Sequence, residues 1–326
     1  MNYIKLIRPI NLLMIILTMY LFRLCFITAT PYKVFFVEPV LSNIEFFLLT
    51  VATVFIAAGG YVINDIFDSD IDLINKKDKT IIGNEISEDE AYNFYKVLCL
   101  VGIICTIILA FLTKNFRLSL FPVLIMVILN FYAHTFKKQL IVGNFIVSLC
   151  TAFVILLIAL FESGGESMVN TNEATIRGGI FAAAIVYGSF AFFTTFLREI
   201  IKDMEDIIGD EQYDCKTIPI VFGIKKTKII SIFIGILLLL FLGSIAFFLP
   251  QLKMKTAALV LVFTIMVPLV SLCIFIGIAK SKKQFHMLSN ATKMIMLLGV
   301  LTMLYFMNGM GPYVFVQYVN FLKKLF

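Results

Sequence analysis

Nine long apolar runs constrain the fold of this 326-residue chain more than any other feature. They lie near residues 9–30, 43–64, 93–112, 117–134, 140–161, 177–197, 229–249, 256–279 and 290–308. A helix needs about 20 mostly apolar residues to cross a bilayer. Of all residues, 60% are apolar and 15% charged, whereas soluble domains have about 45–50% and about 25%. The sequence therefore predicts an all-α, polytopic membrane protein with nine transmembrane helices in a single domain, 1–326.

The basic residues predict how these spans are oriented. Nine spans place the N-terminus and the connections after spans 2, 4, 6 and 8 on one side, where most of the 27 Lys and Arg residues lie. Because cytoplasmic loops carry an excess of Lys and Arg, we expect this side to be cytoplasmic, in a cell inner or cytoplasmic membrane. The formal net charge of +6 reports this orientation and requires no nucleic-acid partner.

Two acidic segments lie on the same side. The first ends the second span and contains Asn64, Asp65, Asp68 and Asp72. The second ends the sixth span and contains Glu199, Asp203, Asp206 and Asp210. In both, three aspartates are spaced by three and then four residues, which places them within roughly 60° of one another on a helix. The two sets are 138 positions apart, so we expect two pseudo-repeated halves with motifs near 64–72 and 199–210.

Three carboxylates on one helical face require a compensating cation. Like charges at these spacings repel one another, and a charge within the membrane costs at least about 2.5–3.5 kcal/mol. Mg²⁺ prefers carboxylate oxygens and completes its shell with water and phosphate oxygens. The two segments therefore predict a Mg²⁺-bridged diphosphate site at the membrane surface. The alternative is two solvated acidic loops beside lysines, but the matched spacing on one side favours the metal site.

These residues resemble the UbiA superfamily of intramembrane prenyltransferases. The first signature of that family, N-D-x-x-D-x-x-x-D, is present from Asn64 to Asp72, and the second, D-x-x-x-D, is present as Asp206 and Asp210. The resemblance implies nine transmembrane helices around a central cavity with a cytosolic cap. The run from Arg198 to Asp206 is most similar to the digeranylgeranylglyceryl phosphate synthase branch.

The resemblance also implies a reaction and its cofactor. Two Mg²⁺ ions are expected on five aspartates, Asp65, Asp68, Asp72, Asp206 and Asp210. The implied partners are a prenyl diphosphate, a membrane-soluble acceptor and membrane lipid. The implied reaction is transfer of a geranylgeranyl group from its diphosphate to the hydroxyl of geranylgeranylglyceryl phosphate, through an allylic cation.

Six further residues are predicted to bind substrate: Asn64, Lys79, Tyr132, Lys137, Arg198 and Lys202. Lys79 stands where relatives commonly have Arg, and the neighbouring prolines of that family stretch are absent. Tyr132 is equally interpreted as an aromatic anchor at the interface. Arg8 precedes the first span, where setting orientation is the commoner role and reaching the cavity is the alternative.

An alcohol acceptor requires a group that takes its proton. Glu199 and Asp203 are the candidate catalytic residues, and a structural pairing with Arg198 or Lys202 is the alternative. Two other functions compete with ether formation. One is C-prenylation of an aromatic quinone precursor. The other is a cation-coupled secondary transporter, a class often built from repeated halves, although the acids here lie at helix ends and not at the membrane midplane.

Overall fold

The described residues of the chain form helices and no strand. The structure is a computed structural model that describes residues 2–28, 38–75, 80–163, 171–307 and 311–325. Its first helices are α1 (Asn2–Leu6), α2 (Pro9–Phe22), η1 (Arg23–Thr28), α3 (Asn43–Phe67), α4 (Ser69–Asn75), α5 (Glu88–Thr113), α6 (Phe116–His134), η4 (Phe136–Lys138) and α7 (Val142–Ser163). Those that follow are α8 (Thr171–Gln212), α9 (Ile218–Phe248), η5 (Leu249–Leu252), α10 (Lys255–Leu261), η6 (Val262–Met266), α11 (Val267–Ile278), α12 (Lys282–Leu301), η7 (Thr302–Phe306) and α13 (Gly311–Leu325).

Nine helices within the described ranges are long and apolar enough to span a membrane. They comprise Pro9–Thr28, Asn43–Phe67, Glu88–Thr113, Phe116–His134, Val142–Glu162, Ala174–Gln212, Ile218–Leu252, Lys255–Ile278 and Lys282–Phe306. Each corresponds to one predicted apolar run, so the predicted all-α fold with nine membrane helices is confirmed. The protein is an integral membrane protein.

The third and ninth spans begin several residues earlier than their apolar runs. Helix α5 follows Ser87, whose hydroxyl accepts the amide of Glu90 while the Glu90 carboxylate accepts the amide of Ser87. Helix α12 begins with the same reciprocal cap between Ser281 and Gln284. Such capping boxes start a helix in polar sequence. Hydropathy detects only the apolar part of these helices, which explains why the predicted spans were too short.

The chain divides into two compact units. Unit 1 contains residues 1–17, 41–150 and 206–223, and unit 2 contains residues 18–40, 151–205 and 224–326. Helix α8 therefore belongs to unit 2 up to Glu205 and to unit 1 from Asp206.

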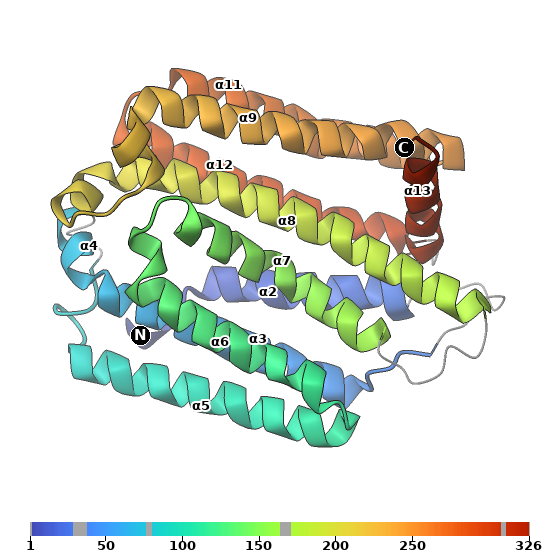
Figure 1. Cartoon of the computed structure of the whole chain (residues 1–326), viewed down its shortest axis with the longest axis horizontal. Coiled ribbons are helices and arrows are strands. Elements are labelled where there is room, and N and C mark those ends of the chain that lie inside the picture. The colour runs from blue at the N-terminus through green and yellow to red at the C-terminus, as the bar shows by residue number, and fades with distance from the viewer. Residues whose placement is uncertain (1, 29–37, 76–79, 164–170, 308–310, 326) are drawn as a thin grey trace. The chain divides into compact units, whose positions relative to one another are not determined.

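In unit 1, α3 packs against α5 and α6, and the three helices run side by side in Figure 1. Buried Leu6, Val62, Ile66 and Leu98 belong to the apolar core that these elements share. Because the apolar surface removed from water stabilises packing by roughly 25 cal/mol per Å², this core holds the C-terminal end of α3 in place. That end carries the first acidic segment.

In unit 2, the C-terminal helix α13 lies across the ends of longer helices (Figure 1). It buries one face, with Val314, Phe315 and Tyr318 at helical spacing. The hydroxyls of Tyr318 and Ser244 are 2.6 Å apart, which ties α13 to α9.

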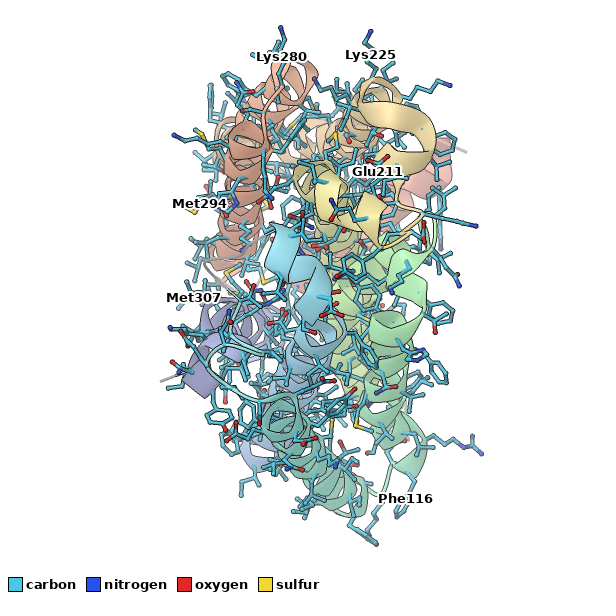
Figure 2. All side chains as sticks on the ribbon, turned by 90° about the vertical axis from the view of Figure 1, so that its left-hand side faces the viewer. Phe116, Glu211, Lys225, Lys280, Met294 and Met307 are labelled. Atoms are coloured by element: carbon cyan, nitrogen blue, oxygen red, sulfur yellow. The ribbon has the colours of Figure 1, made fainter. Side chains whose placement is uncertain are left out.

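The opposite end of unit 2 is basic. Lys225 and Lys280 extend outward at the same edge of the molecule in Figure 2. The ammonium of Lys228 donates to the carbonyl oxygens of Gly277, at 3.2 Å, and Ala279, so it neutralises the C-terminal end of α11. The predicted connections after spans 6 and 8 thus meet on one side of this unit.

Candidate functional site

The first acidic segment lies where α3 meets α4. Helix α3 ends at Phe67, Asp68 is its C-cap residue with φ −94° and ψ −2°, and α4 begins at Ser69. The amide of Asp72 donates to the carbonyl of Asp68 at 2.8 Å. Asp65 therefore lies in α3, Asp68 between the two helices and Asp72 in α4. The prediction that the three aspartates lie within 60° assumed one continuous helix, and the helix is interrupted at Asp68.

Asn64 positions the Asp68 carboxylate. Its Nδ2 atom donates to Asp68 Oδ2 at 2.7 Å, and both side chains are buried. The Oδ1 atom of Asn64 is also buried and accepts no hydrogen bond from the described residues. Leaving a buried acceptor unsatisfied costs about 1–3 kcal/mol. This oxygen is therefore suited to a water molecule or to the water shell of a cation.

Lys137, in the connection between α6 and α7, supplies a cation to this segment. Its ammonium contacts the Asp68 carboxylate. Burial lowers the pKa of Lys137, but the charges of Asp68 and then Tyr132 and Asp72 outweigh it and raise that pKa above its ordinary value. The predicted substrate contacts Lys137 and Tyr132 thus lie within electrostatic range of the first motif.

Arg8, between α1 and α2, supplies a second cation. Its guanidinium contacts the Asp65 carboxylate and lies 5.2 Å from the centre of the Tyr61 ring. Burial lowers the pKa of Arg8, while Asp65, Tyr61 and Asp68 raise it to a net value above normal. Of the two roles considered for Arg8, the structure favours contact with the site.

The second acidic segment reaches the first through Asn75 and Gly209. The Gly209 amide of α8 donates to the Asn75 side-chain oxygen at 3.0 Å. A Cβ atom at Gly209 would lie only 2.4 Å from the Asn75 side-chain nitrogen, so only glycine permits this approach. The contact joins the end of α4 to the end of α8, between Asp206 and Asp210.

The pKa of the Cys215 thiol depends on the charged groups around this junction. Burial, together with the nearby carboxylate of Asp210, raises the pKa of Cys215 to about 11. Lys138 and Lys137 oppose this increase, and Asp68 adds to it. One residue of each acidic motif therefore lies within electrostatic range of the same thiol. The amide of Lys216 also donates to the Lys138 carbonyl at 2.9 Å, which anchors the chain after α8.

The other predicted site residues belong to unit 2 or lie outside the described residues. Lys79 lies outside the described residues. Arg198 contacts Glu199, the structural pairing considered as an alternative to catalysis, and both belong to unit 2. Lys202 and Asp203 are partly buried on α8 in the same unit.

Comparison with known proteins identifies the family. The model of the UbiA prenyltransferase family matches residues 24–296. The chain belongs to the UbiA prenyltransferase family. It is 34% identical over 198 residues to the digeranylgeranylglyceryl phosphate synthase of Sulfurisphaera tokodaii, over 60% of this chain and 64% of that protein. It is 31% identical over 236 residues to the Methanosphaera stadtmanae protein of the same name, over 72% of this chain and 74% of that protein.

Solved structures share the UbiA fold. A structure concerning digeranylgeranylglyceryl phosphate synthase in membranes matches with a TM-score of 0.61 and 22% identity, over 94% of this chain and 98% of that chain. A UbiA homolog from Archaeoglobus fulgidus bound to DMAPP and Mg²⁺ matches with a TM-score of 0.57 and 15% identity, over 93% of this chain and 99% of that chain. The predicted family and fold are thereby confirmed. The cytosolic cap and the single domain with two repeated halves stay predictions.

The UbiA signature residues suit a hard cation. Among the residues that the structure describes, no three His, Cys, Asp or Glu side chains are close enough together to hold a metal ion. Asp65 and Asp68 instead each contact a basic side chain. The donor atoms themselves, carboxylate oxygens and the unsatisfied amide oxygen of Asn64, are of the kind that Mg²⁺ prefers.

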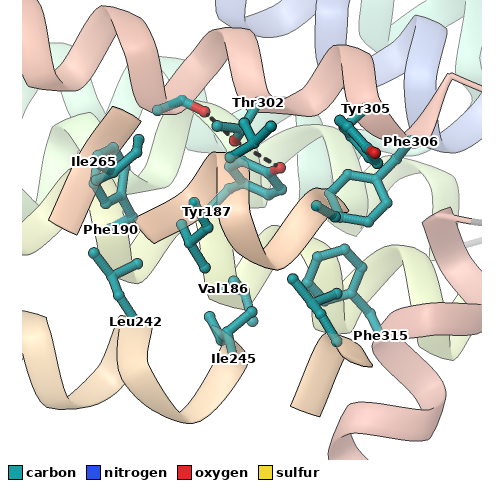
Figure 3. A pocket seen from close by; sticks show the side chains of 15 residues that line it. Val186, Tyr187, Phe190, Leu242, Ile245, Ile265, Thr302, Tyr305, Phe306 and Phe315 are labelled. Carbon is teal, nitrogen blue, oxygen red and sulfur yellow. Dashed lines mark hydrogen bonds between the residues drawn. The ribbon is translucent and has the colours of Figure 1, made fainter. Parts of the chain in front are cut away.

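Unit 2 contains an apolar pocket. Figure 3 shows its lining, with Tyr187, Phe306 and Phe315 among the aromatic side chains. The hydroxyls of Tyr187 and Thr302 are 3.2 Å apart at its wall. Apolar surfaces of this kind suit hydrocarbon ligands.

Sequence reasoning missed several residues near the motifs. Asn75 and Gly209 carry no family signature, and only their contact reveals their role. His286 lies 2.9 Å from the Glu205 carboxylate, and its other ring nitrogen lies 3.2 Å from the Asn290 amide. Glu205 directly precedes Asp206, and this cluster holds the last residue of α8 that belongs to unit 2. The adjacency of Glu205 to a signature aspartate was the one available signal.

Proposed function

We propose that this UbiA family member is a Mg²⁺-dependent geranylgeranyltransferase. It transfers the geranylgeranyl group from its diphosphate to the hydroxyl of a glycerol phosphate lipid, geranylgeranylglyceryl phosphate. Support for this acceptor comes from the relatives named digeranylgeranylglyceryl phosphate synthase. The matched stretch covers 64% of the first of these proteins.

The observation that carries the proposal is the junction of the two motifs in unit 1. The contact between Asn75 and Gly209 brings the end of α8 to the end of α4. Two basic side chains, Arg8 and Lys137, already lie against the carboxylates of the first motif. Carboxylates that contact basic side chains beside such a junction suit a metal diphosphate better than solvated loops.

The carboxylates of both signatures are the proposed Mg²⁺ ligands: Asp65, Asp68, Asp72, Asp206 and Asp210. The fold match to the A. fulgidus homolog bound to DMAPP and Mg²⁺ supports this choice of metal. Bound Mg²⁺, in two ions on our proposal, neutralises the diphosphate and stabilises charge on the leaving group. Asn64 holds Asp68 in orientation through its hydrogen bond.

Substrate recognition falls to basic and polar groups beside the carboxylates. Lys137 is the proposed point-charge contact for the diphosphate, supported by its position against Asp68. Tyr132 lies near enough to influence Lys137 and is proposed to line the same site. Further proposed contacts are Lys79, Arg198 and Lys202.

The reaction breaks the C–O bond between the allylic carbon and the diphosphate, which leaves with the electron pair. The acceptor hydroxyl oxygen attacks the resulting allylic cation and loses its proton. Asp203 and Glu199 are the proposed proton acceptors. Apolar walls exclude the water that would otherwise capture the cation.

An acceptor panel tests this proposal. The purified protein in detergent with Mg²⁺ and radiolabelled geranylgeranyl diphosphate is expected to form a lipid product from geranylgeranylglyceryl phosphate. Hydroxybenzoate and naphthoate acceptors are expected to give none. Products from the aromatic acceptors alone would support C-prenylation instead, and cation-coupled uptake into vesicles without any product would support a transporter.

Matched aspartate variants test the metal assignment. Asp68→Ala and Asp206→Ala are expected to abolish turnover because each removes a proposed ligand. Asp70→Ala is the control, since Asp70 belongs to the same segment but is exposed. Full activity of either ligand variant would refute the assignment.

A further inference from the structure

Arg8 is held in an unusual backbone conformation at the site. Its φ is 51°, in the left-handed region that residues other than glycine seldom adopt. It also precedes Pro9, and a following proline further restricts its conformation. Strained residues of this kind persist where surrounding contacts impose them, often at ligand-binding sites. Backbone hydrogen bonds hold Arg8 on both sides, because its amide donates to the Lys5 carbonyl at 3.1 Å and its carbonyl accepts from the Asn11 amide at 2.9 Å.

The Arg8 side chain points to the acidic motif and not to the lipid headgroups. Its guanidinium contacts Asp65 and lies over the Tyr61 ring, and only a third of the side chain is exposed. An arginine that only set membrane orientation would need none of these contacts. Figure 1 shows the N-terminal segment beside the end of α3, in agreement with this pairing.

The ion pair and a metal compete for the same carboxylate. A guanidinium and Mg²⁺ held against the same carboxylate repel each other as like charges, so each weakens the binding of the other. Before ligand binding, however, an uncompensated cluster of carboxylates would repel itself. Arg8 and Lys137 relieve that repulsion. Once displaced, a guanidinium offers a planar fork of donors that matches phosphate oxygens.

We propose that Arg8 is a displaceable counter-ion of the metal site. It neutralises Asp65 in the ligand-free protein, and Mg²⁺ with prenyl diphosphate displaces it. The freed guanidinium then contacts the diphosphate. This inference rests on the proposed function, because it assumes that Asp65 binds the metal.

Mn²⁺ binding tests the counter-ion role without measuring turnover. Free and bound Mn²⁺ are measured by electron paramagnetic resonance on the full chain in detergent, without diphosphate. Arg8→Gln removes the competing cation, so it is expected to bind Mn²⁺ about tenfold more tightly than the wild type. Lys5→Gln is the matched control, because Lys5 pairs with exposed Glu85 at 3.8 Å, away from the motif, and its affinity is expected to stay unchanged.

A non-reactive thiolo analogue of geranylgeranyl diphosphate tests the second half of the proposal. In the presence of Mn²⁺, Arg8→Gln is expected to bind the analogue about tenfold more weakly than the wild type. Arg8→Lys keeps the charge but loses the fork, so Mn²⁺ affinity should resemble that of the wild type while analogue binding weakens. In an Asp65→Asn background, Arg8→Gln should no longer affect Mn²⁺ affinity.

The outcomes separate this inference from the proposed function. Unchanged or weaker Mn²⁺ binding by Arg8→Gln, in a protein whose wild type binds Mn²⁺, would overturn the role of Arg8 alone. A wild type that binds no Mn²⁺ with or without the analogue would overturn the metal assignment and this inference with it. The lysine variant keeps the test decisive if the glutamine variant does not fold.

Discussion

At the scale of single residues, the site depends on charges that compensate one another across distant parts of the chain. Asp65 and Asp68 are not solvated loop carboxylates, because each contacts a basic side chain from another element. Breaking a buried ion pair by removing one partner leaves an uncompensated charge. The site therefore depends on its basic side chains, Arg8 and Lys137, as well as on the aspartates of the signature.

Replacing Lys137 should weaken binding of the prenyl diphosphate selectively. A hydrogen bond to a charged group is worth about 1.5–3 kcal/mol, so Lys137→Gln is expected to raise the KM for the diphosphate roughly tenfold to hundredfold. Lys138→Gln is the control, because Lys138 adjoins Lys137 in sequence but is exposed. Steady-state kinetics with varied diphosphate measure both variants, and equal effects would contradict a specific role for Lys137.

The raised pKa of Cys215, about 11, predicts slow alkylation at neutral pH. The thiolate is the reactive form, so the rate with iodoacetamide should rise about tenfold per pH unit until the pH approaches 11. Because the unfolded thiol ionises at lower pH, near 8.5, this group should also reduce stability as the pH rises above that value. Mass spectrometry in EDTA measures the rate.

Asp210→Asn provides the internal check on this explanation. Removing the carboxylate beside Cys215 should lower its pKa and speed its alkylation at pH 8. Cys215→Ala identifies the labelled peptide. A rate that does not change with pH would show that access, and not ionisation, limits the reaction.

At the scale of elements, the site is made by one close approach between helices. The end of α8 meets α4 at Gly209, where any side chain would collide with Asn75. The position of the second motif relative to the first therefore depends on a residue that performs no chemistry itself.

Gly209→Ala should reduce both stability and activity. The added methyl group must displace the Asn75 side chain and its hydrogen bond, and overpacking of this kind costs about 1–3 kcal/mol. Gly178→Ala, in the same helix but with nothing within 4 Å of the added Cβ, is the control and should be neutral or stabilising by up to about 1 kcal/mol. Thermal unfolding in detergent and turnover measure both.

The Asn75→Ala variant tests whether the collision with the Asn75 side chain causes the loss of stability in Gly209→Ala. In that background, the further change Gly209→Ala should cost much less than it does in the wild type, because the methyl group no longer meets the amide. If Gly209→Ala costs as much stability in the Asn75→Ala background as in the wild type, the collision with Asn75 is not the cause of the loss.

At the scale of the whole molecule, nine membrane helices and the basic loops predict one topology. We expect the connections after even-numbered spans to be cytoplasmic. In a cysteine-free background, Lys280→Cys and Lys114→Cys place exposed thiols in connections predicted to lie on opposite sides. A membrane-impermeant maleimide added to intact cells should label the cysteine at position 114 and not the one at 280. The reverse pattern would invert the topology.

Much of the architecture is readable from the chain because membrane insertion is a local property. A run of about 20 apolar residues is a spanning helix whatever its neighbours are, and the nine runs matched nine helices in the part of the chain that the structure describes. The start of α5 was less predictable, because its cap depends on Ser87 and Glu90 and not on hydropathy. The aspartate spacing likewise identified both motifs before any fold was known.

The amino-acid sequence by itself determined the membrane helices, the two acidic motifs and the family to which they belong. Only the tertiary structure decided which groups neutralise those motifs and how they meet. Arg8 and Asp65 are 57 positions apart, and Asn75 and Gly209 are 134 positions apart. Hydropathy acts along a single membrane span, and the aspartate spacing acts over about two helical turns. Ion pairs and close backbone approaches depend on how distant helices pack, so no local pattern encodes them.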